Sequence, residues 1–206
     1  MTAPVDVGSE WNERYAKPGY AYGVEPNGFL ASVAERIPKG RVLSLGEGEG
    51  RNGVHLAGLG YDVTAVDISE VGLEKAGRLA TEQNVGISTV VADLATYEIE
   101  PDTWEGIISI FCHLPKPLRE RVHGAVASGL RPRGVFVLEA YSPRQLDFGT
   151  GGPPVRELLV SLEELQREVG TLDLLIAQET ERDIVEGRCH QGHSAVVQVV
   201  GVKREG

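Results

Sequence analysis

The sequence predicts a doubly wound α/β fold: a mostly parallel seven-stranded sheet with helices on both faces and a C-terminal antiparallel hairpin. Short apolar runs alternate with amphipathic helical segments between residues 41 and 138, as in repeated strand–helix units. The last two apolar runs are joined by a loop that contains Gly187 and Gly192, which favours antiparallel pairing. At 206 residues, the length suits one core, so residues 1–206 are expected to form a single domain.

The expected strands are short, mainly apolar runs bounded by turn or charged residues. They cover residues 41–45, 62–66, 88–91, 106–110, 135–138, 173–180 and 195–202. The repeated strand–helix units among the first five imply that these strands pair in parallel. Their carboxyl ends then meet at one edge of the sheet, where open α/β sheets bind ligands.

Capping residues mark the helices. Asn27 precedes a helix with an apolar face, and Ser69 precedes another that carries Leu73, Ala76 and Leu79 on one side. Ser161-Leu162-Glu163-Glu164 is a capping box. Two further helices are expected from Trp11 to Tyr15 and after Pro115 and Pro117, since a first turn tolerates proline.

Composition excludes several classes of partner. The formal net charge is −10 and the sequence pI is near 5.0, which argues against nucleic acid or an anionic membrane surface. No apolar run reaches the roughly 18 residues of a membrane span, and Met1–Glu10 has no signal-peptide character. Cys112 and Cys189 have no paired spacing, so we expect free thiols and a cytoplasmic location.

The segment after the first strand is the strongest functional signal. Gly46, Gly48 and Gly50 form a turn between a strand and a helix, which is a common seat for a nucleotide-like ligand. The turn also carries Glu47 and Glu49, which would repel a pyrophosphate and tolerate a cationic ligand.

Two aspartates follow the next two strands. Asp67 can accept both hydroxyls of a ribose, and Asp93 can accept the exocyclic amine of an adenine. Each also has a plain structural interpretation, Asp67 as a helix cap and Asp93 as a loop residue. Their shared position at the carboxyl edge of successive strands favours a common ligand site.

These motifs resemble the class I S-adenosylmethionine-dependent methyltransferases of the tellurite-resistance and thiopurine methyltransferase type. The likeness is carried by Trp11-Asn12-Glu13-Arg14-Tyr15, Tyr22-Gly23, Pro26-Asn27, Phe29-Leu30, Leu45 to Asn52, Asp67-Ile68-Ser69, Asp93-Leu94 and Phe111-Cys112-His113-Leu114. The resemblance implies a cofactor site made by Tyr22, Gly46, Glu47, Gly48, Gly50, Arg51, Asn52, Asp67, Ile68, Ser69, Asp93, Leu94, Phe111 and Cys112. It also implies that residues 1–40 form a helical cover over that site; ordinary packing on the sheet edge is the alternative.

The implied cofactor is S-adenosyl-L-methionine, and the implied reaction is methyl transfer to a small molecule or small oxyanion of the thiol, thiopurine, tellurite or selenite class. The chain departs from the family at Ser44, where an acidic residue usually helps to orient the cofactor. Glu47 or Glu49 is expected to supply the negative charge instead, or backbone groups take that role.

His113 and Tyr141 are the candidate catalytic residues, since both follow strands at the ligand edge. His113 is a general base or a hydrogen-bonded wall residue; Tyr141 acts on the acceptor or packs against it. Glu139 is a further carboxylate near them, with a structural role as the alternative.

Arg14, Arg156 and His190 are candidate substrate contacts, Arg156 lying in a long connection from 142 to 160 that is typical of a binding loop. His190 and His193 beside Cys189 do not make a convincing metal site, so no metal is predicted.

Two other functions remain compatible with the sequence. Gly48 to Gly53 satisfies the G-x-G-x-x-G pattern, so an NAD(P)-dependent oxidoreductase is the first alternative. A non-catalytic S-adenosylmethionine-binding protein or scaffold is the second. The sequence leaves the oligomeric state open.

Overall fold

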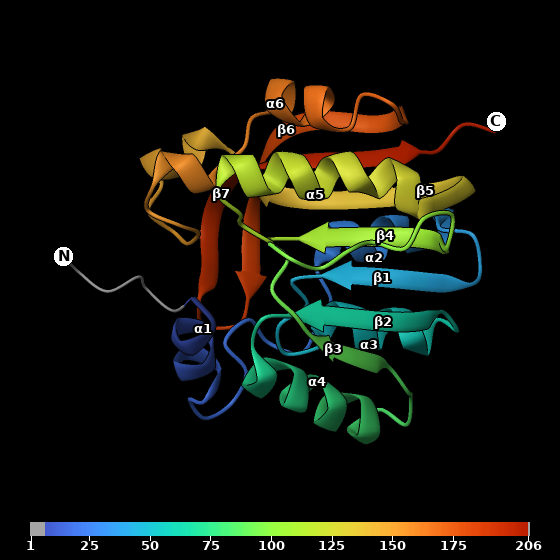
Figure 1. The fold of residues 1–206 in the computed structure, drawn as a ribbon. Helices are drawn as coiled ribbons and strands as arrows, with labels where there is room; N and C mark the ends of the chain where they lie inside the picture. The colour runs from blue at the N-terminus through green and yellow to red at the C-terminus, as the bar shows by residue number, and fades with distance from the viewer. Residues whose placement is uncertain (1–6, 206) are drawn as a thin grey trace.

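The computed structural model describes residues 7–205, and a single seven-stranded sheet forms its centre. The strands are β1 (Arg41–Leu45), β2 (Asp62–Asp67), β3 (Ser88–Val91), β4 (Trp104–Ile110), β5 (Leu130–Tyr141), β6 (Asp173–Glu186) and β7 (His190–Val202). They are ordered β3-β2-β1-β4-β5-β7-β6. Strands β1 to β5 pair in parallel, and β7 is antiparallel to both β5 and β6. The predicted fold class is confirmed (Figure 1).

The described chain also has six α-helices and three short 3-10 helices, of which α1, α2 and η1 precede β1. The α-helices are α1 (Val7–Tyr15), α2 (Gly28–Val33), α3 (Arg51–Gly58), α4 (Glu70–Glu82), α5 (Lys116–Gly129) and α6 (Leu162–Glu168). The 3-10 helices are η1 (Ala34–Arg36), η2 (Pro143–Asp147) and η3 (Arg156–Leu158). Residues 1–6 of the predicted N-terminal cover lie outside the described residues.

The three predicted N-caps are confirmed. Asn27 accepts the N–H of Leu30, Ser69 accepts that of Gly72, and Ser161 makes the capping box with Glu164.

Alternation along the central strands builds a core on each face of the sheet. Leu43 of β1 and Ile107 of β4 face one core, together with apolar residues of α5 and α6. Val42 and Ile108 face the other core, with apolar residues of α2 and α3. Because both faces are buried, the strands read as nearly continuous apolar runs rather than as alternating ones.

The C-terminal hairpin is longer than predicted. β6 and β7 reach Glu186 and His190, so Gly192 and His190 lie in a strand and not in the connecting loop. Residues 181–194 are mostly polar and pair only with each other beyond the end of β5, so hydrophobic periodicity does not mark them.

The tip of this hairpin docks on the N-terminal segment. The N–H groups of Arg188 and Cys189 donate to the carbonyl of Ala21, at 3.0 and 3.2 Å. Gly187 has a φ of +63°, and a Cβ there would lie 2.3 Å from the backbone nitrogen of Gly23. Two segments far apart in sequence are therefore packed backbone against backbone.

No helix within residues 7–205 has the length and apolar character to cross a membrane.

We expect Gly187→Ala to lower the free energy of unfolding by more than Gly60→Ala does. Both glycines have positive φ, which costs a residue with a Cβ about 1–2 kcal/mol. Only Gly187 has backbone in the way of the new methyl group, since nothing lies within 4 Å at Gly60, and overpacking adds about 1–3 kcal/mol. Urea denaturation of both variants measures the difference; equal losses would show that the hairpin tip does not pack on the N-terminal segment.

Candidate active site

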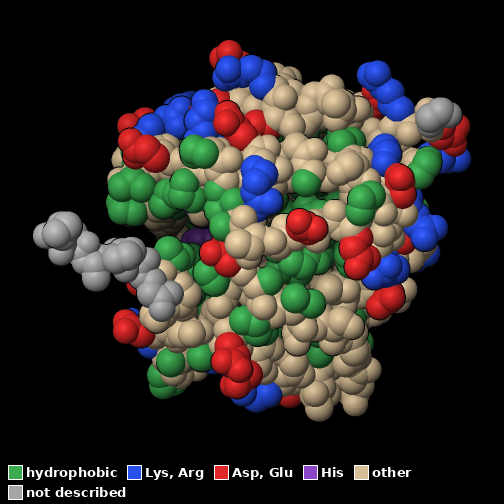
Figure 2. Space-filling model, in the orientation of Figure 1, with side chains coloured by type: hydrophobic (Ala, Val, Ile, Leu, Met, Phe, Trp, Pro, Cys, Tyr) green, Lys and Arg blue, Asp and Glu red, His purple; other side chains and the backbone are tan. Residues whose placement is uncertain are grey.

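The candidate site lies where the strand order reverses, between the carboxyl ends of β1 and β4. From there the chain continues outward to β2 on one side and to β5 on the other. The segments that follow β1 and β4 touch: a Cβ on Gly46 would lie 2.6 Å from Sγ of Cys112. This reversal is the usual ligand position of an open α/β sheet. Figure 2 shows a histidine in a hollow beside hydrophobic side chains at this end of the sheet.

The glycine turn follows β1 as predicted. Gly46, Gly48 and Gly50 have φ values of +66°, +68° and +98°, which only glycine adopts without strain. The N–H groups of Gly46 and Glu47 both donate to the carbonyl of Val66, so the turn remains fixed to β2.

Glu47 folds back under this turn and caps α3. Its Oε1 accepts the N–H groups of Asn52, at 3.1 Å, and Gly53, at 2.8 Å, and its Oε2 accepts the hydroxyl of Ser44. Burial raises the pKa of Glu47, while these donors and Arg51 oppose the rise. The amino end of α3 is therefore occupied by a buried carboxylate that lies against Ser44.

Asp67 stands at the end of β2, beside the turn. Its Oδ2 accepts the N–H of Gly48 and its Oδ1 accepts that of Ser69, each at 2.8 Å. Burial raises the pKa of Asp67, although these backbone donors counteract it. Each carboxylate oxygen keeps a second lone pair that can accept a ligand hydroxyl. Ile68, also predicted for the cofactor site, is half-buried next to it, and Ser69 caps α4.

Asp93 and Leu94 follow β3. Asp93 is exposed, and its Oδ1 accepts the N–H of Ala95 at 2.7 Å. Among the described residues its Oδ2 has no hydrogen-bond partner, so one oxygen is open to an external donor. Leu94 is buried beneath it in the core.

The N-terminal segment covers the turn. Tyr15 lies so close that a Cβ on Gly48 would come within 2.7 Å of its hydroxyl. Glu49 also binds this N-terminal segment, because it accepts the N–H of Ala21 at 2.6 Å. It pairs with Lys75 at 2.8 Å as well. Glu49 is therefore neutralised by a lysine and fastens the cover to the turn.

Five rings meet at the ends of β4, β5 and β7 and form an aromatic box. Its members are Tyr22, Phe111, His113, Tyr141 and His190. Ring centroids are 4.7 Å apart for Phe111 and Tyr141, 5.5 Å for His113 and Tyr141, and 4.5 Å for Tyr22 and His190. Phe111 has a φ of +52°, an uncommon value for a bulky residue that marks functional turns. The box thus unites the predicted His113, Tyr141 and His190.

Polar atoms inside the box lack partners. Nδ1 of His113 lies 3.2 Å from the carbonyl of Leu158, but its Nε2 is buried with no partner. Burial and the neighbouring His190 lower the pKa of His113 to about 3, although the hydrogen bond to the Leu158 carbonyl opposes this shift. The ring is therefore neutral near pH 7. The hydroxyl of Tyr141 is also buried without a hydrogen-bond partner, and Nδ1 of His190 has Glu186 as its ion-pair partner at 3.9 Å. Buried polar atoms of this kind can bind a ligand or an ordered water molecule.

Cys112 is a thiol here. Burial and the charge of Asp67 raise its pKa to about 12, so the thiol is protonated near pH 7.

A cluster of buried ion pairs lies beside the aromatic box and contacts it through His190. Glu186 pairs with Arg51 at 2.7 Å and with Arg182 at 3.1 Å, and Arg182 also binds Glu139 at 2.6 Å. Asn27 donates to both glutamates. Glu139 and the predicted ligand residue Arg51 are therefore held in contacts within the protein, as is Asn52, whose Oδ1 accepts the N–H of Asn27.

Sequence reasoning missed Glu186, Arg182 and the carbonyl of Leu158. Their positions on a polar stretch of strand and in the long connection carry no motif, so no spacing signal identifies them.

Of the predicted substrate contacts, Arg14 and Arg156 lie outside the aromatic box, and His190 belongs to it. Arg14 donates to the hydroxyl of Tyr22 at 2.8 Å, which places it beside the box. Arg156 donates to the carbonyl of Leu159 at 3.2 Å and is half exposed. His190 is a correction: it is buried at the start of β7 and not on an open loop. His193 is exposed and pairs with Glu181 and Asp183.

Within the described residues, no group of three or more His, Cys, Asp or Glu side chains is placed to hold a metal ion.

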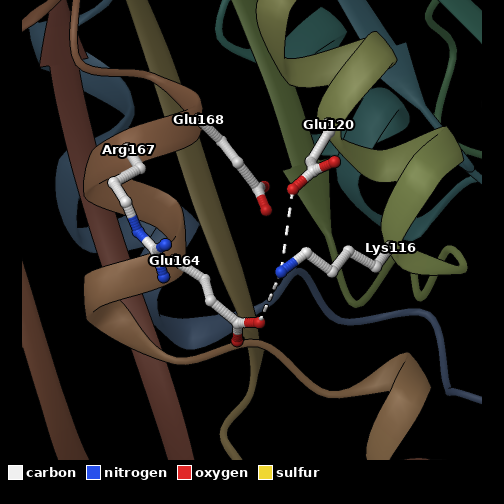
Figure 3. A pocket seen from close by; sticks show the side chains of 5 residues that line it. All are labelled: Lys116, Glu120, Glu164, Arg167 and Glu168. Carbon is white, nitrogen blue, oxygen red and sulfur yellow. Dashed lines mark ion pairs between the residues drawn. The ribbon is translucent and has the colours of Figure 1, made fainter.

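A separate cavity of about 330 Å³ lies between α5 and α6 (Figure 3). It is lined by Lys116, Glu120, Glu164, Arg167 and Glu168. Lys116 lies 3.8 Å from Glu120 and 3.6 Å from Glu164, and Glu168 binds the buried Arg119 at 2.9 Å. Its main charges are thus satisfied within the protein, and none of its residues belongs to the predicted site.

Residues 42–134 match the family model described as a methyltransferase domain. Over 98 residues the chain is 35% identical to the probable S-adenosyl-L-methionine-dependent methyltransferase TehB of two Haemophilus influenzae strains. That stretch is 47% of this chain and 33% of TehB, so the chain spans about a third of the length of the curated relatives it matches.

Solved structures share the fold over almost the whole chain. The crystal structure of TehB from Haemophilus influenzae has a TM-score of 0.69 at 20% identity, over 96% of this chain and 67% of that one. Another solved structure has a TM-score of 0.76 at 17% identity, over 96% of this chain and 89% of that one. It is described as the conversion of a disulfide bond into a thioacetal group during echinomycin biosynthesis. Magnesium protoporphyrin IX methyltransferase of Synechocystis PCC 6803 with bound SAH has a TM-score of 0.66 at 18% identity, over 96% of this chain and 95% of that one.

We expect the ion cluster to make the free energy of unfolding depend on pH in the acidic range. Burial raises the pKa of Glu186, but His190, Arg51 and Arg182 outweigh it and lower that pKa from 4.5 to about 2. The carboxylate therefore stabilises the fold above about pH 4.5, and this contribution is lost as the pH falls toward 2. Urea denaturation between pH 7 and pH 3 should show a steeper fall for the wild type than for Glu186→Gln, by about 2 kcal/mol across these pH values. The exposed Glu98→Gln is the control, and identical slopes in wild type and Glu186→Gln would contradict the assignment.

Proposed function

We propose that this chain is a class I S-adenosylmethionine-dependent methyltransferase of the TehB type and that it transfers a methyl group to a small acceptor molecule; the methyltransferase-domain match and the likeness to TehB support this. The cofactor supplies a methyl group that is already activated by its sulfonium charge. The protein then has to bind the two reactants in line, exclude water and manage one proton.

One observation carries the choice of cofactor: the carboxylate of Glu47 occupies the N–H groups of Asn52 and Gly53 at the amino end of α3. A dinucleotide places its pyrophosphate on such N–H groups. Here it would meet a buried carboxylate instead. S-adenosylmethionine has no phosphate and carries positive charge, so this end of the sheet suits it and disfavours NAD(P).

The residues at the strand ends fit an adenosine. Asp67 lies beside the glycine turn with lone pairs left for two ribose hydroxyls, and Asp93 has an oxygen left for the adenine amine. In this proposal Gly46 and Gly48 give the cofactor access to the backbone, and Phe111 and Tyr22 flank it. The cover formed by Tyr15 and Ala21 would keep water away from the bound cofactor.

The acceptor is assigned to the aromatic box. Its five rings and its unpartnered polar atoms suit a small molecule better than a polymer, and the net charge of −10 disfavours nucleic acid. The proposed classes are thiols, thiopurines and the oxyanions tellurite and selenite, because the sequence motifs resemble the tellurite-resistance and thiopurine methyltransferase type. A cytoplasmic location is part of the proposal, because the two cysteines lack paired spacing.

Isothermal titration calorimetry with S-adenosylhomocysteine, NADH and NADPH tests the cofactor. We expect S-adenosylhomocysteine to bind and the nicotinamide cofactors not to bind. Asp67→Asn should weaken binding about tenfold or more, because hydrogen bonds to a charged group are worth roughly 1.5–3 kcal/mol. Asp62→Asn, at the exposed opposite end of the same strand, is the matched control and should bind as the wild type does.

Binding of NADH or NADPH without S-adenosylhomocysteine would replace the proposal by an oxidoreductase. Binding of S-adenosylhomocysteine without transfer of labelled methyl to any of the four acceptor classes would instead leave a non-catalytic binding protein.

A further inference from the structure

The ring of Tyr141 is covered by backbone of the long connection. Tyr141 lies at the end of β5 and is fully buried, with 0% of its surface exposed. A Cβ on Gly152 would lie 2.6 Å from Cδ2 of this ring, and a Cβ on Gly151 would lie 3.0 Å from its hydroxyl. Only residues without a side chain come this close, so the two glycines let the connection lie directly on the aromatic box.

The box is closed in this structure. The centroids of its contacting rings are between 4.5 Å apart, for Tyr22 and His190, and 6.1 Å apart, for Phe111 and His113. These are the separations of aromatic rings that touch. The hydroxyl of Tyr141 and Nε2 of His113 are both buried. An acceptor therefore reaches these atoms only after part of the box has moved.

Buried contacts hold the neighbouring walls of the box in place. The N–H of Phe111 donates to the carbonyl of Glu139 at 2.7 Å, beside the parallel pairing of β4 with β5. Tyr22 follows Ala21, whose N–H donates to the buried carboxylate of Glu49 at 2.6 Å. Moving either wall would leave a buried acceptor without its donor, which is costly.

Residues 150–152, called the 150–152 segment below, are held differently. Oγ1 of Thr150 donates to the carbonyl of His193 at 2.7 Å and lies 3.1 Å from Oγ of Ser194. Nε2 of Gln145 donates to Oγ1 of Thr150 at 3.0 Å and to the carbonyl of Gly151 at 3.1 Å. The segment is half-buried to exposed, so water can replace these bonds when it lifts. Long glycine-containing connections beside a site commonly act as lids.

We propose that the 150–152 segment is a gate through which the methyl acceptor, and not the cofactor, enters the aromatic box, and that Gly152 is the residue that allows this gate to close on Tyr141. The inference rests on the proposed methyl transfer and adds the route to its acceptor site. The cofactor has its own entrance, because Gly48 of the glycine turn lies under Tyr15 of the N-terminal segment.

A disulfide across the gate tests this proposal. The neighbouring hydroxyls of Thr150 and Ser194 suit a cysteine pair, so Thr150→Cys/Ser194→Cys can be oxidised to lock the segment and reduced to release it. Wild type taken through the same oxidation is the control for Cys112 and Cys189. A disulfide that does not form would contradict the contact on which the inference rests.

Calorimetry then measures two ligands. S-adenosylhomocysteine reports on the cofactor site. Benzyl methyl sulfide, added to the S-adenosylhomocysteine complex, reports on the box; it carries an aromatic ring and has no thiol to reduce the lock. We expect wild type and the reduced variant to bind both ligands. The oxidised variant should bind S-adenosylhomocysteine as the reduced one does and benzyl methyl sulfide at least about tenfold more weakly, because apparent affinity falls with the fraction of open molecules.

Equal binding of benzyl methyl sulfide by the oxidised and reduced forms would overturn the gate, as would its failure to bind wild type. Loss of S-adenosylhomocysteine binding on oxidation would overturn the separate entrances. The failure of the proposed function is distinct, since it appears as absent binding of S-adenosylhomocysteine by wild type.

A glycine pair tests how the gate closes. Gly152 and Gly149 have φ values of +80° and +64°, so alanine is strained at both, but nothing lies within 4 Å of a Cβ on Gly149. Gly152→Ala should lower kcat for benzyl mercaptan up to about 10²-fold, because a 1 Å misplacement can cost that much. Gly149→Ala should lose much less, and both should keep their affinity for S-adenosylhomocysteine. Equal losses of kcat in the two variants would show that closure does not depend on the contact with Tyr141 and would overturn the role of Gly152.

Discussion

The carboxylate of Glu47 at the amino end of α3 is the interaction on which the rest of the site depends. It satisfies two N–H groups of the helix and accepts the hydroxyl of Ser44, so turn, strand and helix are joined at one buried group. The same contact determines which ligands suit the turn. Where a dinucleotide fold leaves a helix end open to phosphate, this chain fills it with its own negative charge.

Around that turn, ion pairs join segments that are distant in sequence. Glu186 on the C-terminal hairpin holds Arg51 at the start of α3, and Glu49 holds the N-terminal cover through Ala21 and Lys75. Buried pairs of this kind are strongly destabilising when one partner is removed, although their net contribution to stability is small. Their effect here is to fix the position of the aromatic box relative to the glycine turn.

Features encoded locally were predictable from the sequence. The strand–helix alternation, the caps at Asn27 and Ser69 and the glycine turn depend on residues near one another in the chain, and the structure confirms them. The direction of Glu47 was not predictable, because it is decided by which donors the folded chain presents. Glu186 and the carbonyl of Leu158 were missed for a related reason: they act through tertiary contacts and carry no periodic or motif signal.

We propose above all that an adenosine with a sulfonium-bearing tail binds at the reversal between β1 and β4. A crystal structure with S-adenosylhomocysteine bound tests this proposal most directly. We expect the ribose hydroxyls within hydrogen-bond distance of Asp67, the sulfur facing the aromatic box, and Glu47 still on the N–H groups of Asn52 and Gly53. A ligand bound away from Asp67, or a Glu47 carboxylate released from α3 to contact the ligand, would contradict it.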